Sequence, residues 1–242
     1  MNLILYYLFV YLIEAIILWL YCNRIFTSRK NTFLSLLITI GMFSLLIPVA
    51  ILTNAALNAF CSFIVYLCCI VLNYDSKPVW ALFHALALTI LMALSEGLIA
   101  AAIPDITIYA FRDGNIHSSA FTFVILSKSV YLCISQLVTR IFSKNTVNNA
   151  SIRKSTLMLY LIPVMSSIIT VSLGYICLNG KLSGSDSVIV FICLVLLLSI
   201  NILTFYLQQD ISQKNVEYAR LQIELQKETD TEHYYNYVQE VN

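Results

Sequence analysis

Charged side chains are scarce in this sequence of 242 residues. Lysine, arginine, aspartate and glutamate make up 11% of the chain, whereas a soluble globular domain carries roughly a quarter. The formal net charge is +1, and the basic residues gather into no cluster. A nucleic-acid-binding protein needs a basic face, so that class is excluded. The hydrophobic content of 60% indicates instead a polytopic membrane protein.

The sequence also lacks the patterns of a metal site, a disulfide framework or a cleavable signal peptide. Its seven cysteines include no CxxC pair, and all fall within or at the ends of apolar segments, where cysteine packs as a small hydrophobic residue. We therefore expect neither disulfides nor a bound metal. Arg24, Arg29 and Lys30 follow the first apolar run rather than precede it. This order predicts a retained first helix with its N-terminus outside.

Long apolar runs fill most of the chain. A helix needs about 20 apolar residues to cross the hydrocarbon core of a bilayer. The runs predict an all-α membrane bundle over residues 1–207, with about seven spans at 3–22, 33–53, 56–72, 79–103, 119–142, 156–179 and 187–207. The third run is short and follows the second closely, so the two predict a tight hairpin or a partly re-entrant one. Pro48 and Pro163 predict a kink or a local break in the second and sixth spans, and Pro78 suits the first turn of the fourth.

Basic residues are distributed unevenly between the predicted loops. Cytoplasmic loops usually carry the excess of lysine and arginine. With the N-terminus outside, the inner loops hold Arg24, Arg29, Lys30, Lys77, Arg140, Lys144, Arg153 and Lys154, and the outer loops hold Arg112 and Lys181. The bias therefore predicts an outside N-terminus and a cytosolic C-terminal tail.

The tail, residues 208–242, is predicted to be a helix continuous with the last span. Residues 208–228 are rich in glutamine, glutamate and lysine and contain no glycine or proline. Its apolar residues follow a heptad seam that Lys214 interrupts, formed by Leu207, Ile211, Tyr218, Leu221 and Leu225. The pattern predicts a cytosolic signalling helix that pairs with its copy in a homodimer. No stop signal precedes Asn242, so we expect the helix to lead into a further domain.

Four ionisable residues fall inside predicted spans, where burial is costly and a functional role is the default hypothesis. Glu96 and Lys128 lie at similar depths in neighbouring spans and are predicted to pair, either to stabilise the bundle or to bind a ligand and couple the signal. Glu14 has no obvious partner by depth, and we expect it to be protonated, to face a water-filled cavity or to meet Lys128. His84 is expected to be a hydrogen-bonded interior histidine.

The predicted outer loop around residues 104–118 mixes apolar and charged side chains. Tyr109, Phe111 and Arg112 are candidate contacts for an amphipathic peptide ligand. The same composition equally fits a loop that lies in the lipid interface.

The chain has a multi-span domain, then a Gln- and Glu-rich helix, then the stretch ETDTEHYYNYVQEVN. This order resembles the N-terminal half of peptide-sensing histidine kinases of the Agr/Com quorum-sensing type. The kinase core of that family belongs to the GHKL superfamily. The resemblance implies a sensor in the bacterial plasma membrane, a small secreted peptide as its ligand, and a kinase module beyond this chain. The kinase module of the family binds ATP and Mg²⁺ and acts on a response regulator. His233 is followed by Tyr-Tyr rather than by the acidic residue and asparagine of the family's acceptor box, so it does not take the phospho-acceptor role. We expect no catalytic residue and no cofactor within this sequence.

Two other classes remain open. A transporter or channel subunit would place Glu14, Glu96 and Lys128 along one aqueous path. A membrane peptidase would use Cys68 or Cys69 as a nucleophile and His84 as its base, because these residues lie at the inner ends of neighbouring predicted spans.

Overall fold

The computed structural model describes residues 3–52, 55–104, 118–141, 161–179 and 184–241. Among these residues, five helical segments are long and apolar enough to cross a membrane: Leu3–Ile25, Thr32–Ile51, Pro78–Ala102, Ser119–Arg140 and Ser185–Tyr234. The all-α bundle predicted from the apolar runs is therefore confirmed, and it is compatible with a multi-pass membrane protein. The shorter apolar stretch Leu57–Asn73 and the helix Leu161–Asn179 are not among the five, so the count of seven spans stays a prediction.

The second predicted span is broken, as Pro48 predicted. The chain enters through α1 (Leu3–Ile25), and the second apolar run forms α2 (Thr32–Ser44) and the short α3 (Ile47–Ile51), with Pro48 in the first turn of α3. Proline has no N–H to donate, and its ring clashes with the carbonyl four residues earlier. The backbone tightens there, because Leu45 N–H donates to the Met42 carbonyl and Leu46 N–H to the Phe43 carbonyl.

A two-residue antiparallel ladder joins the ends of α1 and α4 (Ala55–Asn73). Its strands are β1 (Thr27–Ser28) and β2 (Tyr74–Asp75). Next to the ladder, Arg29 Nε donates to Asp75 Oδ1 at 2.5 Å. The chain therefore returns, through α2, α3 and α4, to the end of the bundle at which α1 finishes.

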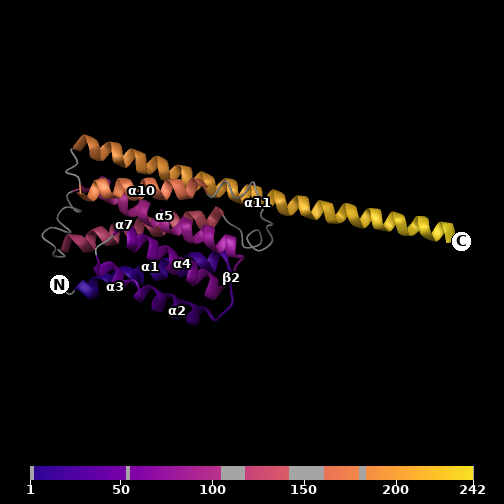
Figure 1. Ribbon diagram of the computed structural model, residues 1–242, viewed down its shortest axis with the longest axis horizontal. Helices are drawn as coiled ribbons and strands as arrows, with labels where there is room; N and C mark the ends of the chain where they lie inside the picture. Colours follow the sequence, from indigo (N-terminus) through magenta and orange to yellow (C-terminus); the bar gives the residue numbers. More distant parts are fainter. Residues whose placement is uncertain (1–2, 53–54, 105–117, 142–160, 180–183, 242) are drawn as a thin grey trace.

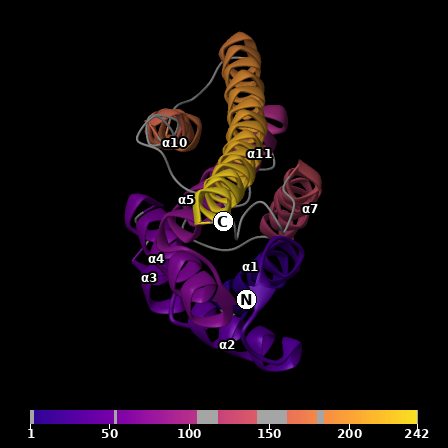
Figure 2. The same cartoon turned by 90° about the vertical axis from the view of Figure 1, so that its right-hand side faces the viewer.

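The central helix is α5 (Pro78–Ala102), which contacts α4, α7 (Ser118–Ile141), α10 (Leu161–Asn179) and α11 (Gly184–Val241). Pro78 occupies its first turn, as expected. Small residues let neighbouring helices approach closely in membrane bundles, and the buried surface of α5 includes Ala81, Ala85, Ala87, Ser95, Gly97, Ala100 and Ala101. Viewed along the bundle, α11 lies between α10 on one side and α7 on the other (Figure 2).

The last helix, α11, runs without a break for 58 residues. At 1.5 Å per residue it is about 87 Å long, and its C-terminal half projects beyond the bundle (Figure 1). This confirms that the last span and the tail form one helix. No change of structure separates residues 1–207 from 208–242, so that domain boundary stays a prediction from composition.

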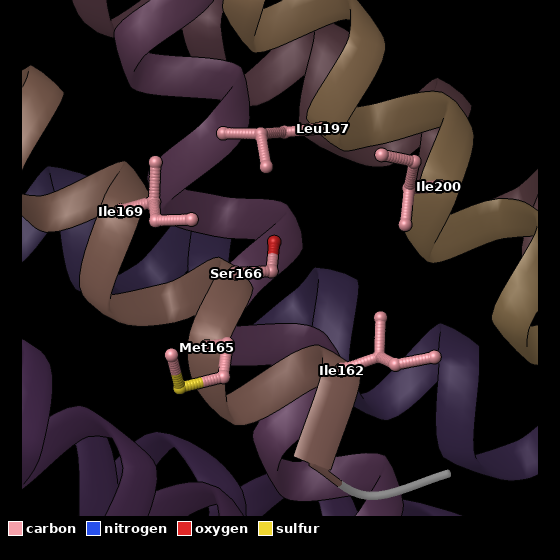
Figure 3. A pocket seen from close by; sticks show the side chains of 6 residues that line it. All are labelled: Ile162, Met165, Ser166, Ile169, Leu197 and Ile200. Atoms are coloured by element: carbon pink, nitrogen blue, oxygen red, sulfur yellow. The ribbon is translucent and has the colours of Figure 1, made fainter.

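An apolar groove of about 250 Å³ lies between α10 and α11 (Figure 3). It is lined by Ile162, Met165, Ser166, Ile169, Leu197 and Ile200. The two helices are also joined by a buried hydrogen bond, in which Asn201 Nδ2 donates to Ser166 Oγ at 2.5 Å. Polar contacts of this kind help to hold helices together in a bilayer, where the hydrophobic effect supplies little driving force for helix association.

Candidate functional site: a buried acid–base triad

Three charged side chains from three helices meet inside the bundle. Lys128 Nζ on α7 lies 2.5 Å from Glu14 Oε1 on α1 and 2.5 Å from Glu96 Oε1 on α5. The pairing of Glu96 with Lys128 predicted from depth is therefore confirmed. For Glu14 the sequence left three environments possible, and the structure places its carboxyl group against the same ammonium group. We call these three residues the triad.

The triad lies on the buried faces of its helices. On α1, the buried Tyr11, Glu14 and Leu18 recur at intervals of three and four, which places them on one side of a helix. On α7, Lys128 and Tyr131 are buried at the same spacing. The charges are therefore part of the face that packs into the core.

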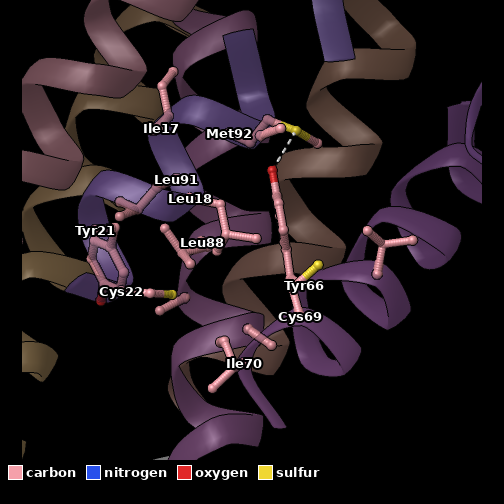
Figure 4. Close-up of a cluster of buried hydrophobic side chains, with 14 of the residues drawn as sticks. Ile17, Leu18, Tyr21, Cys22, Tyr66, Cys69, Ile70, Leu88, Leu91 and Met92 are labelled. Atoms are coloured by element: carbon pink, nitrogen blue, oxygen red, sulfur yellow. Dashed lines mark hydrogen bonds between the residues drawn. The ribbon is translucent and has the colours of Figure 1, made fainter. Parts of the chain in front are cut away.

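Buried phenol groups surround the triad, and the sequence analysis did not predict this layer. Tyr11 Oη donates to Asn58 Oδ1 at 2.8 Å, and Tyr131 Oη donates to Tyr66 Oη at 3.4 Å. Tyr66 Oη in turn donates to Met92 Sδ at 3.3 Å, within the apolar packing of α1, α4 and α5 (Figure 4). Tyr11 precedes Glu14 by three residues, and Tyr131 follows Lys128 by three. Since residues three apart share a helix face, this spacing is the sequence feature from which the phenol layer could have been predicted.

The three members of the triad differ in accessibility. The side chains of Lys128 and Glu14 are 2% and 3% exposed, whereas that of Glu96 is 38% exposed. Buried charges are tolerated when they are paired and hydrogen-bonded, which Lys128 achieves with two carboxylates. Glu14 Oε2 is buried and has no hydrogen-bond partner. Glu96 is therefore the most accessible member of the triad.

The helix that carries Glu96 also carries the contacts to α11. At Gly97, the next residue, the backbone of α5 is covered by the side chain of Leu194 from α11. Near one end of the bundle Ser187 Oγ donates to the Ala101 carbonyl at 2.6 Å. Further along, the rings of Phe83 and Phe205 meet edge to face at a centroid distance of 5.6 Å. One helix therefore connects the triad to the long C-terminal helix.

His84 has the environment of the interior histidine that the sequence predicted. Its Nδ1 is hydrogen-bonded to Tyr21 Oη at 2.8 Å. The ring is packed against Phe26 and Phe83 edge-on and against Trp80 face to face, and the residue is fully buried. A general base for peptide hydrolysis must reach a substrate, so this enclosure does not favour the peptidase interpretation.

The cysteines are free thiols where they are described. Cys69 is buried in the main core, and Cys68 is partly buried. In the described ranges, no three His, Cys, Asp or Glu side chains form a group that could hold a metal ion.

The other candidate residues divide into two sets. Tyr109, Phe111 and Arg112 of the predicted outer loop lie outside the described residues. In the predicted seam, Leu207, Tyr218, Leu221 and Leu225 are exposed in the single chain, and Ile211 is partly buried. In the same segment Lys214 Nζ pairs with Asp210 Oδ2 at 2.8 Å, and this carboxylate raises the pKa of Lys214 above its usual value.

Comparison with known proteins identifies no relative, since no protein-family model, no curated protein and no solved structure matches this chain. What the chain does is therefore inferred from its own residues.

Proposed function

We propose that this chain is the membrane receptor part of a sensor histidine kinase, which senses a small secreted peptide and passes the signal along α11 to a cytosolic kinase module. The observation that carries the proposal is the continuity of α11, which packs on the central helix of the bundle and then extends far beyond it. A continuous helix transmits a rotation or a shift from one end to the other. The response regulator and the ATP-binding kinase core belong to this proposal.

A homodimer along α11 is supported by the apolar residues on its surface. The exposed residues Ile189, Ile192, Leu196, Ile200, Leu203 and Leu207 follow one another at intervals of three and four. This stripe leads directly into the heptad seam, where Tyr218, Leu221 and Leu225 are 61%, 49% and 62% exposed. Lipid can cover the first part of the stripe, but the seam lies in the polar part of the chain. A second copy of α11 covers both parts at once.

The charges beside the seam support a parallel pair. Asp210, Glu217 and Glu224 flank it on one side. The other side carries the neutral residues Asn215, Gln222 and Thr229. In a parallel coiled coil each acidic residue faces a neutral residue of the partner helix, whereas an antiparallel pair would place acids opposite acids. Two receptors in one membrane also have the same orientation, which requires the parallel arrangement.

The proposed orientation places the N-terminus outside and the tail in the cytosol, as the distribution of basic residues predicted. The ladder that joins the ends of α1 and α4 brings Arg29, Lys30 and Lys77 to one end of the bundle, which supports a cytosolic face there. Glu96 then belongs to the outer half of α5. We propose that the peptide binds among the outer halves of the helices and the loop that contains Tyr109, Phe111 and Arg112.

The signal would pass through α5. A ligand shifts a conformational equilibrium only by its differential affinity for the two states. A peptide that contacts Glu96 changes the position of α5, and the contact of Gly97 with Leu194 transfers that change to α11. Rotation of α11 relative to its copy then sets the activity of the kinase.

Cysteine cross-linking tests the dimer. Single cysteines are placed at successive positions from Leu196 to Leu225 in a variant whose native cysteines are replaced by alanine, and the protein is oxidised in membranes. We expect disulfide-linked dimers at Leu196, Leu203, Leu221 and Leu225, and none at Val195 or Arg220, which lie off the stripe. Cross-linking without periodicity, or none in the seam, would exclude the proposed interface.

Helical coupling is tested by insertion. The chain is joined after Asn242 to a histidine-kinase core, and one to four alanines are inserted after Leu225. Since each residue rotates the helix by about 100°, we expect autophosphorylation to vary with the phase of the insert. Autophosphorylation that is the same for every insert would contradict signalling through the helix.

A transporter or channel subunit is the second candidate, because the three intramembrane charges meet at one place. Uptake or conductance in liposomes that Glu96→Gln abolishes would favour this function over the receptor.

A further inference from the structure

The charges of the triad do not balance. Two carboxyl groups, from Glu14 and Glu96, share the single ammonium group of Lys128. If all three groups were ionised, the cluster would hold one net negative charge, with Glu14 and Lys128 almost completely buried. An uncompensated charge in an apolar interior is strongly unfavourable. One additional positive charge would balance the cluster.

Among the described residues, no neighbouring side chain supplies it. The titratable side chains that face the triad in this part of the chain are the phenols of Tyr6 and Tyr11 on α1, Tyr66 on α4 and Tyr131 on α7. Phenols are neutral near pH 7, and α4 contains no charged residue.

The remaining cationic residues of the triad's own helices are distant along the chain. Arg24 on α1 and Arg140 on α7 are in the last turns of their helices. At 1.5 Å per residue they lie about 15 Å and about 18 Å from Glu14 and Lys128. His84, on α5, is about 18 Å from Glu96 by the same measure and is enclosed by aromatic rings.

We propose that the triad is a proton-binding site, in which the two carboxyl groups together hold one proton and so carry a single negative charge opposite Lys128. The unpartnered Oε2 of Glu14 supports the assignment, because a buried carboxylate oxygen without a donor costs more when the group is ionised than when it is protonated. Both carboxyl groups bond the same ammonium nitrogen, so the proton belongs to the pair rather than to one residue.

The proton comes from water and reaches the triad through Glu96. This is the only one of the three side chains with substantial exposure, at 38%. Proton exchange at the carboxyl pair would change the charge of a cluster that joins α1, α5 and α7. The assignment holds whether the chain is a receptor or a transporter, since it rests on the charge count and the burial of the triad alone.

The charge count makes a numerical prediction for each variant. The number of bound protons equals the number of carboxyl groups minus the number of ammonium groups. Glu14→Gln and Glu96→Gln each leave one carboxylate opposite Lys128, and each is expected to bind no proton. Lys128→Arg keeps the cation and is expected to retain one proton, whereas Lys128→Met is expected to hold two.

Infrared spectroscopy of the whole chain in lipid membranes tests this directly, because a protonated carboxyl group has a carbonyl stretch that a carboxylate lacks. Carbon-13 labelling of glutamate identifies the band. We expect one glutamic-acid band at neutral pH in the wild type, its loss in Glu14→Gln and in Glu96→Gln, and its retention in Lys128→Arg. Glu217→Gln, on the exposed tail, is the matched control and is expected to leave the band unchanged.

Two outcomes would overturn the proposal. One is a wild-type protein without a protonated glutamic acid at neutral pH, a result that depends on no variant and therefore on no variant's folding. The other is a band that persists in both glutamine variants, which would assign the proton to a glutamate outside the triad. Neither outcome bears on the receptor function, which the cross-linking and insertion experiments test separately.

Discussion

Leu194 of α11 packs directly on the backbone of α5 at Gly97, the residue that follows Glu96 of the triad. A Cβ atom added at Gly97 would lie 3.2 Å from Leu194 Cδ1, so the contact depends on the missing side chain. The same turn of α5 thus faces the buried charges on one side and the long C-terminal helix on the other. A displacement of this turn of α5 would displace α11, and the reverse, because packed interiors leave little free space.

Substitution of Gly97 tests this contact. Glycine to alanine in an exposed helix usually stabilises by roughly 0.5–1 kcal/mol, and Gly41 on α2, where a Cβ would meet nothing within 4 Å, provides the matched control. We expect Gly97→Ala to be less stable than Gly41→Ala by about 1 kcal/mol or more, because Leu194 must move. Thermal unfolding in detergent measures the difference. In a Leu194→Ala background the penalty at Gly97 should disappear, and its persistence would show that another contact limits the site.

Removal of the ammonium group should be the most harmful change within the triad. Lys128→Met leaves no cation opposite the two carboxyl groups, so both must be protonated to avoid an unpaired buried charge, which would cost about 3–5 kcal/mol. It should therefore lower the stability more than Glu14→Gln or Glu96→Gln, each of which leaves a neutral pair. Arg220→Met, in the exposed pair with Glu224 and off the seam, should leave the unfolding temperature unchanged, since exposed ion pairs contribute little. Equal effects at Lys128 and Arg220 would refute a structural role for the triad.

The bond between Tyr21 and His84 should stabilise the end of the bundle at which α1 finishes. Tyr21→Phe removes only the hydroxyl group that bonds His84 Nδ1, and loss of one buried partner typically costs about 1–3 kcal/mol. Tyr206→Phe on the exposed side of α11 is the control, with little change expected. If Tyr21→Phe unfolds at the wild-type temperature, the buried hydrogen bond makes no net contribution.

The hydrogen bond between Asn201 and Ser166 should couple α11 to α10. Interhelical hydrogen bonds in membrane proteins contribute about 0.6 kcal/mol on average in double-mutant cycles, and we expect a coupling energy of that order between Asn201→Ala and Ser166→Ala. Ser199→Ala is a control, because Ser199 Oγ donates to the Val195 carbonyl of its own helix. Strict additivity of the Asn201 and Ser166 substitutions would show that the bond does not hold the two helices together.

The features that depend on neighbouring residues could be predicted from the amino-acid sequence. Apolar runs of sufficient length form the helices, Pro48 breaks the second of them, and the heptad spacing after Leu207 continues α11 into the tail. Each of these follows from a local property: hydrophobic length, a missing N–H group, or a 3.5-residue repeat. The pairing of Glu96 with Lys128 could also be predicted from the sequence, because the helices that carry them follow one another and their depths can be estimated by counting residues.

Which sides of the helices face one another depends on how the helices pack in three dimensions. Depth along the chain left three environments open for Glu14, and its contact with Lys128 depends on how α1 and α7 are rotated about their axes. The contact of Gly97 with Leu194 and the phenol layer around the triad depend on the same rotations. Apolar side chains surround most of each helix, so the sequence carries little information about the rotation of a membrane helix. The packing of α7 against both α1 and α5, and of α11 against α5, fixes these rotations and with them the composition of the buried site.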